Sequence, residues 1–332
     1  MKQLEKTDIQ LGYIPLLDCI AILWAKYRGF FTETGLNVQL VKEPSWASLR
    51  DRLAFGFLDA AHCLSAMLPA AAIGLDQSGI PFQTPLILST NQAYISLSQK
   101  LCFELDINSS DTAQQSAQKV VQAYLQGRPI QLAQVFKYSL HHYCLREWLA
   151  LADEQVAQHF ELKTLPPPYM VEAVSNHLID GFCAGEPWNT QGELQGYSKI
   201  ITSSQTIIPK VADKVLAVTA EWASQHPNTL TALVEAIQKA QYELKQMQDY
   251  QQIWQLLIHY NIIRFQCSAE IHVDRFYFIK NIIQNFIIGE SAQPQLADFI
   301  WLTEKMLKWE QLDSYSSDFH QLGQSCIYKL QC

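Results

Sequence analysis

The sequence predicts an α/β protein with two lobes of parallel or mixed β-sheet around a central ligand cleft. Strand-like apolar runs alternate with helical segments through most of the chain, and this order builds parallel sheets with right-handed crossovers. The alternation occurs twice, and the last third of the chain reads as helices. A length of 332 residues is enough for two domains of ordinary size. We expect lobe I to comprise residues 1–94 and 205–332, and lobe II residues 95–204.

The first lobe is expected to begin with a β-α-β-α-β series. Short apolar runs favour strands, and Asp or Ser before an amphipathic stretch favours a helix start. Asp18 and Ser45 are therefore the expected N-caps of the first two helices. The expected elements are strands at 9–14, 36–42 and 59–62, helices at 19–31 and from 46, a helix at 65–74, and strands at 85–89 and 91–98.

Trp46 is the most informative residue of this series, because it falls in the first helical turn after a strand. In open α/β sheets, ligands bind at the carboxyl ends of strands, and a helix N-terminus presents free N–H groups to an anion. The pattern thus suits a small anion. On spacing alone, however, a capped amphipathic helix whose tryptophan is buried for packing is the more common explanation.

The second lobe repeats the alternation. Three consecutive prolines before YMVEAVSNHLI favour a helix start, because proline is tolerated in the first helical turn. The expected elements are helical segments at 99–126, 139–152 and 167–179 and strands at 130–136, 160–165, 181–184 and 199–202. A strand at 215–219 then precedes a long helix, whose second part Asn228 or Thr229 is expected to cap, and a later helix covers 301–307.

Composition limits the class of protein. Hydrophobic residues make up 48% of the chain and charged residues 17%, which is typical of a globular protein. The net charge of −8 argues against nucleic acid as a direct partner, because phosphate binding needs clustered Lys and Arg. Neither a secretory signal nor a membrane-spanning apolar run is evident, so we expect a cytoplasmic protein without membrane insertion. The eight scattered cysteines are expected to be buried, reduced thiols.

Motifs for catalysis are missing from the sequence. It contains no Walker loop, no G-x-G-x-x-G, no nucleophile elbow and no His or Cys spacing typical of a metal site. Cys183 is the one thiol near the proposed pocket, and we expect it to pack in the core. A binding protein without a cofactor or metal is therefore expected, and not an enzyme.

Several sequence blocks carry a family resemblance. LGYIPLLDCIAILWAKYRGFF, EPSWASLRDRL, LDAAH, PPPYMV, GFCAGEPWN and LTEKMLKW resemble, in register from about Gln10 to about Gln311, the nitrate and bicarbonate binding proteins of bacterial ABC importers. The blocks look equally like the cytosolic relative of that family, the NasS-type nitrate/nitrite sensor. The resemblance implies a type II periplasmic-binding-protein fold in which one anion is enclosed between the lobes.

The resemblance also implies a set of ligand residues: Trp46, His141, Pro167, Gly185 and Lys214. The bicarbonate-binding branch carries an acid at the position of Lys214, so lysine favours nitrate or nitrite. Nitrate has no proton to donate, and its ideal site offers only donors, such as ammonium, indole and imidazole N–H groups. Bicarbonate would need an acceptor for its hydroxyl.

Some of these positions have a plain structural interpretation as well. A lone lysine at a strand start is usually solvated, and His141 stands beside His142 in a stretch that also suits a surface or capping role. His62, at the end of a predicted strand, is expected to be a core histidine. Glu186 is expected to anchor its loop, although it could orient a donor.

One family ligand is displaced. The glutamine that contacts nitrate in the importer proteins falls on Ala93 here, with Gln92 one residue before it. Side chains alternate along a strand, so an offset of one residue would turn Gln92 to the opposite face unless the backbone bulges. Gln92 is therefore a further candidate ligand on this condition.

The function implied by the resemblance is that of a cytosolic sensor. The chain would sequester an RNA-binding transcription antiterminator of the NasT type and release it when nitrate or nitrite binds, which controls nitrate assimilation. The alternative is the substrate-binding component of a nitrate-type ABC importer.

Overall fold

The computed structural model describes residues 3–76, 78–266, 271–286, 292–312 and 318–330. The chain divides into two compact units. Unit 1 comprises Met1–Thr90, Val211–Ile263 and Phe276–Cys332, and unit 2 comprises Asn91–Lys210 and Arg264–Arg275. The chain thus changes unit a few residues from the expected positions, and residues 264–275 group with unit 2. That each unit is an independent domain stays a prediction.

Unit 1 is built on a five-stranded mixed sheet with the strand order β2-β1-β3-β10-β4. Strand β1 pairs in parallel with both β2 and β3, whereas β10 runs antiparallel to β3 and to β4. The parallel part is the predicted β-α-β-α-β series. The strands are β1 (Asp8–Tyr13), β2 (Asn37–Lys42), β3 (Ala60–Leu64), β4 (Phe82–Thr90) and β10 (Ala212–Thr219).

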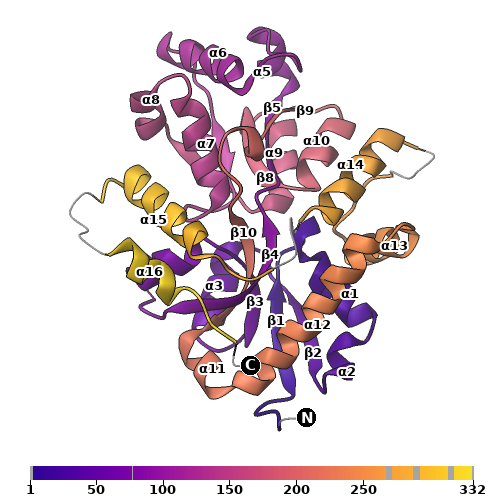
Figure 1. The fold of residues 1–332 in the computed structure, drawn as a ribbon. Coiled ribbons are helices and arrows are strands. Elements are labelled where there is room, and N and C mark those ends of the chain that lie inside the picture. Colours follow the sequence, from indigo (N-terminus) through magenta and orange to yellow (C-terminus); the bar gives the residue numbers. More distant parts are fainter. Residues whose placement is uncertain (1–2, 77, 267–270, 287–291, 313–317, 331–332) are drawn as a thin grey trace. The chain divides into compact units, whose positions relative to one another are not determined.

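Helices lie on both sides of this sheet (Figure 1). One group packs around α12 (Pro227–Gln246) and contains α1 (Ile20–Tyr27), α2 (Phe30–Glu33) and α13 (Gln251–His259). The other contains α4 (Met67–Ala72), α15 (Leu296–Glu310) and α16 (Phe319–Ser325). Helices α3 (Trp46–Ala54), α11 (Ala220–Gln225) and α14 (Val273–Gln284) complete the set among the described residues, and the first three residues of α14 group with unit 2. Residues Ile20 to Ala25 of α1 are all buried, which explains why its sequence is apolar all round.

Unit 2 also has a five-stranded mixed sheet, with the order β7-β6-β8-β5-β9. Strand β6 is parallel to β7 and β8, and β5 is antiparallel to β8 and β9. The strands are β5 (Ala93–Ser98), β6 (Leu132–Gln134), β7 (Leu162–Thr164), β8 (Gly181–Gly185) and β9 (Ser198–Ser203). The helices are α5 (Gln99–Glu104), α6 (Ala113–Leu125), α7 (Leu140–Ala150), α8 (Glu154–His159), α9 (Met170–Ser175) and α10 (Trp188–Leu194).

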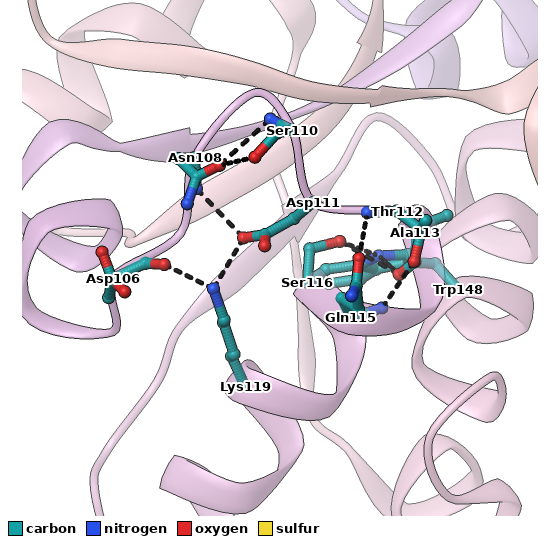
Figure 2. Close-up of polar contacts among 10 residues, drawn as sticks. All are labelled: Asp106, Asn108, Ser110, Asp111, Thr112, Ala113, Gln115, Ser116, Lys119 and Trp148. Carbon is teal, nitrogen blue, oxygen red and sulfur yellow. Dashed lines mark hydrogen bonds and ion pairs between the residues drawn. The ribbon is translucent and has the colours of Figure 1, made fainter.

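The start of α6 illustrates how local sequence fixes an element (Figure 2). The Thr112 hydroxyl accepts a hydrogen bond from the Gln115 backbone N–H at 3.2 Å, and the Gln115 side chain accepts one from the Thr112 N–H at 2.8 Å. This is a capping box, which satisfies two N–H groups at the helix start. The Trp148 indole donates to the Ala113 carbonyl at 3.0 Å and so ties α7 to the same turn.

Two predicted helix caps are wrong. Asp18 lies within the 3-10 turn η1 (Leu17–Cys19) and makes no cap bond, because its carboxylate pairs with side chains of β3 and β10 instead. The N-cap position of α12 is His226, not Asn228 or Thr229. The Glu5 carboxylate accepts from the backbone N–H groups of both of those residues, at 3.2 and 2.9 Å, and thus replaces a local cap.

The thiol prediction holds for the described cysteines, since Cys19, Cys63, Cys102, Cys144, Cys183 and Cys326 are buried and free. Cys267 and Cys332 lie outside the described residues. Within the described part of the chain, no helix has both the length and the apolar character that crossing a membrane requires.

Candidate anion-binding site

In unit 1, the topology gathers polar side chains at one edge of the sheet. Asp18 follows β1, and Trp46 follows β2, so both lie beyond carboxyl ends of parallel strands. Strand β10 runs in the opposite direction, and its first residues, including Asp213 and Lys214, therefore lie at the same edge. Ligands of open α/β sheets bind at this edge.

Lys214 is a fully buried ammonium group. Its Nζ lies 2.7 Å from Asp213 Oδ2 and 3.1 Å from Asp18 Oδ2, and its side chain is 0% exposed. Burial alone would lower the pKa of Lys214, but the charges of Asp18 and Asp213 outweigh burial and raise it. The pKa of Asp18 is held well below its usual value by Lys214 and His62, against the effect of burial. The burial of Lys214 excludes the plain alternative, a solvated lysine at a strand start.

Trp46 and His62 lie beside this ion cluster. The Lys214 Nζ is 5.8 Å from the centroid of the Trp46 ring, and the rings of Trp46 and His62 are 5.6 Å apart. His62 Nε2 lies 2.8 Å from Asp18 Oδ1. Among the described residues, neither the Trp46 indole nitrogen nor His62 Nδ1 has a hydrogen-bond partner, although both are buried. Buried polar atoms usually have hydrogen-bond partners in native proteins, so these two nitrogens are available to a bound molecule.

The sequence places Trp46 correctly. Ser45 caps α3 by accepting from the Ser48 backbone N–H at 3.2 Å, and the Ser48 hydroxyl donates to Glu43 at 2.6 Å. These two bonds fix the first turn of α3, which carries the indole. Trp46 is 1% exposed, so the packing interpretation and the binding interpretation both agree with its burial.

In unit 2, the topology gathers the remaining candidates in the same way. His141 comes after β6, Pro167 after β7, and Gly185 is the last residue of β8. These three strands are parallel, so all three residues lie towards one edge of the unit 2 sheet. Strand β5 is antiparallel to β8, and its first residue, Ala93, stands opposite Gly185.

The two neighbouring histidines of α7 are both buried. His141 is 0% exposed, in the first turn after the Ser139 N-cap, which excludes the surface role that the sequence left open beside ligand contact. The Nδ1 atom of His142 contacts the Gln134 side chain. Burial, together with the positive charges of Arg146 and Lys137, lowers the pKa of His142 to about 3, which keeps that ring neutral.

The turn after β8 contains a buried carboxyl group. Glu186 is 2% exposed, and its Oε2 accepts from the Thr190 backbone N–H at 3.0 Å, which agrees with the expected anchoring role. Burial raises the pKa of Glu186 to about 7. Cys183, in the same strand as Gly185, is buried.

Gln92 lies one residue before β5 begins, so the alternation rule that would turn it away does not apply to it. It is 7% exposed. The adjacent Ala93 N–H donates to the Ser204 hydroxyl at 3.1 Å and holds this end of β5 in place. Whether Gln92 reaches a ligand stays a prediction.

Three residues of the unit 1 cluster escaped the sequence analysis as members of a site: Asp18, His62 and Asp213. They stand far apart in the chain and meet only because β1, β3 and β10 are adjacent. Asp213, next to Lys214, was the one local signal. Among the described residues no group of three or more His, Cys, Asp or Glu side chains is arranged to hold a metal ion.

A separate cavity of about 520 Å³ in unit 1 is lined by residues of α12, α14 and β4 and reaches the ion cluster only through Asp18. Trp46, His62 and Lys214 do not line it. The chemistry of the candidate site therefore belongs to the cluster itself. A buried ammonium and a buried indole N–H without a partner can hold a small anion.

Known proteins resemble this chain in sequence and in fold. It is 36% identical over 240 residues to the bicarbonate transport ATP-binding protein CmpC of Synechocystis sp., covering 71% of this chain and 35% of that protein. It is 31% identical over 246 residues to the nitrate/nitrite binding protein NrtA of Nostoc sp., covering 72% of this chain and 54% of that protein. The chain thus spans about a third to a half of the length of these relatives.

Among solved structures, the periplasmic nitrate-binding protein NrtA from Synechocystis PCC 6803 matches with a TM-score of 0.79 and 24% identity, covering 98% of this chain and 87% of that one. This match confirms the predicted fold class, an α/β protein of the type II periplasmic-binding-protein kind with two mixed-sheet units. The resemblance to the nitrate and bicarbonate binding proteins is likewise confirmed. Residues 2–258 match the NMT1-like family, and the chain belongs to that family.

Proposed function

We propose that this chain binds a monovalent oxyanion, nitrate or nitrite. Its ligands would be Trp46 and Lys214 in unit 1, and His141, Pro167, Gly185 and Gln92 in unit 2. The observation that carries the proposal is the buried Lys214 ammonium beside an indole N–H without a partner. The similarity to the nitrate-binding NrtA proteins supports the same ligand class.

The donor count of Lys214 favours an anion without a proton. An ammonium group has three N–H donors. Two of them face Asp213 and Asp18, which leaves one donor for a ligand. Trp46 adds a second donor, and neither group can accept a hydrogen bond from the hydroxyl of bicarbonate.

Calorimetric titration of the purified chain with nitrate, nitrite, bicarbonate and an alkanesulfonate tests this ligand class. We expect saturable binding of nitrate or nitrite with one anion per chain, and weaker binding of the other two. Preferred binding of bicarbonate or of the sulfonate would overturn the proposal.

We infer further that anion binding changes the affinity of the chain for a protein partner. In this proposal the chain is a cytoplasmic sensor, which holds an RNA-binding antiterminator of the NasT type and releases it when the anion binds. The resemblance to NasS-type sensors supports this role. The chain acts by binding and not by catalysis.

A role as the substrate-binding component of an ABC importer is the second candidate. The similarity to the bicarbonate transport protein CmpC and the nitrate/nitrite binding protein NrtA favours it. Affinity purification of the tagged chain from cells grown without nitrate separates the two roles. The sensor role predicts that an RNA-binding protein co-purifies with the chain. Nitrate at about 1 mM should release this protein. Recovery of membrane transporter subunits instead would support the importer.

A further inference from the structure

The ion cluster of unit 1 already contains more negative than positive charge. Lys214 contributes one positive charge, and Asp18 and Asp213 contribute two negative charges. The pKa of Lys214 is raised and that of Asp18 is lowered, so both are ionised over the ordinary pH range. All three side chains are at least nine-tenths buried. The cluster is therefore one charge negative when His62 is neutral.

An anion added to this cluster would meet a negative site. Like charges in a poorly hydrated interior repel strongly, because little solvent screens them. Lys214 alone cannot attract the anion, since two carboxylates lie within 3.1 Å of its Nζ. Another positive charge is needed at the cluster before a monovalent anion is stable there.

We propose that His62 supplies this charge: the bound anion requires the imidazolium form of His62, so anion binding takes up a proton whenever His62 is neutral in the free protein. This inference rests on the proposed anion binding. His62 thereby becomes a residue of the site, in place of the core histidine expected from the sequence.

The geometry of His62 suits both forms. Its Nε2 lies 2.8 Å from Asp18 Oδ1 and can donate to that carboxylate in either form. Its Nδ1 is buried and has no partner among the described residues. In the imidazolium form Nδ1 becomes a second donor, on a ring 5.6 Å from that of Trp46. Protonation thus adds a charge and a hydrogen-bond donor to the site together.

The other ionisable groups on the elements packed around His62 do not change the net charge of the ion cluster. Burial raises the pKa of three of them, so they stay neutral: Tyr13 of β1, Cys19 of η1 and Cys63 of β3. The charges on α3 are paired locally, Arg50 with Asp51 at 2.6 Å and Arg52 with Glu43 at 3.2 Å. Helix α4 has no ionisable side chain, and Asp8 is at the exposed start of β1.

The test measures the number of protons taken up for each anion bound. The full chain is titrated with sodium nitrate in two buffers of different ionisation enthalpy, at pH values from about 5.5 to about 9, a range that spans imidazole titration. We expect nitrate binding to take up close to one proton per anion over part of this range. Over the range in which uptake is about one, affinity should fall about tenfold for each pH unit.

Three variants identify the proton acceptor. His62→Gln should bind nitrate more weakly and without proton uptake. Asp18→Asn removes one negative charge from the cluster, so nitrate should bind it with little proton uptake. His159→Gln, at an exposed histidine of α8, is the matched control and should keep the uptake of the wild-type chain.

Two results would overturn the inference while the proposed function stands: nitrate binding without proton uptake at every pH, or unchanged uptake in His62→Gln. Failure of the wild-type chain to bind nitrate or nitrite at any pH would instead overturn the proposed function, and the inference with it. If His62→Gln does not fold, nitrogen-15 spectra of the histidine-labelled wild-type chain replace it. We expect nitrate to convert one imidazole to its doubly protonated form in the wild-type chain but not in Asp18→Asn.

Discussion

At the scale of single residues, Lys214 is unusual because lysine is almost never fully buried unless it is paired. Its two carboxylate partners come from different parts of the chain, one beyond β1 and one on β10. The sequence identified the lysine through family resemblance and identified neither partner's role. The pairing of Lys214 with Asp18 depends on which strands are neighbours in the sheet, and no local sequence pattern encodes that.

Replacing Lys214 with glutamate should abolish nitrate binding, because three buried carboxylates would then face the anion. Breaking a buried ion pair typically costs about 3–5 kcal/mol, so the variant should also unfold at lower denaturant concentration. Calorimetry measures the first effect and denaturant unfolding the second. Lys100→Glu, at an exposed lysine in α5, is the control for the change in net charge. Nitrate affinity at the wild-type level in Lys214→Glu would show that the site is assigned wrongly.

Glu186 should make the stability of the protein depend on pH. Burial raises its pKa from 4.5 to about 7 in the folded chain, so the unfolded state loses its proton first as pH rises. The stability contributed by the protonated carboxyl is present below pH 4.5 and is lost as pH rises to about 7. Glu186→Gln should therefore gain about 3 kcal/mol relative to wild type between pH 4.5 and pH 8.

Thermal unfolding of both chains at several pH values measures this difference. The glutamine side chain can still accept the hydrogen bond from the Thr190 N–H, so the local structure is kept. Glu161→Gln, at an exposed position, should show no such divergence from wild type. A constant difference between Glu186→Gln and wild type across the pH range would contradict the argument.

At the scale of elements, the first turn of α3 links sequence to site, because the Ser45 cap holds the turn that carries Trp46. Ser45→Ala should destabilise the protein by about 1 kcal/mol, the usual loss for an N-cap serine. It should also weaken nitrate binding, since Trp46 loses its fixed position. Urea unfolding and calorimetry measure the two effects.

Ser98→Ala is the matched control, because Ser98 caps α5 through the same kind of bond, at 3.1 Å to the Leu101 N–H, and α5 carries no candidate ligand. We expect a similar loss of stability with unchanged nitrate affinity. Equal weakening of binding in both variants would mean that α3 has no special role.

The helix starts and strand ends also show which features can be predicted from the sequence and which cannot. The Ser45 and Ser139 helix starts were predictable because each cap is a bond between residues three apart. Asp18 and the start of α12 were not, because their partners are distant: His62 and Lys214 for Asp18, and Glu5 for α12. The strand β10 was predicted too short for a related reason. Its second and third residues, Asp213 and Lys214, are charged, and they are buried because they pair with each other and Lys214 also pairs with the distant Asp18.

At the scale of the whole molecule, nitrate should stabilise the folded chain. A ligand that binds only the folded state at 100 times its dissociation constant contributes about 2.7 kcal/mol. For units of this size each kcal/mol raises the melting temperature by roughly 2–4 °C. Differential scanning calorimetry with sodium nitrate, and with sodium chloride at equal ionic strength as the control, measures this shift. An equal shift in chloride would mean that the effect is not specific binding.

Because strands β4 and β10 are neighbours, the chain segment between them can be exchanged in a chimera. The chain leaves unit 1 at the end of β4 and returns at the start of β10, where Thr90 and Ala212 are register partners in the same sheet. A tight hairpin loop can therefore connect these two residues without a change in the strand order of the sheet. Residues 91–210, which are the larger part of unit 2, can in this sense be exchanged as one segment. A chimera that carries the corresponding segment of another family member at this junction would keep the sheet that presents Lys214, and residues 264–275 of unit 2 would stay those of this chain.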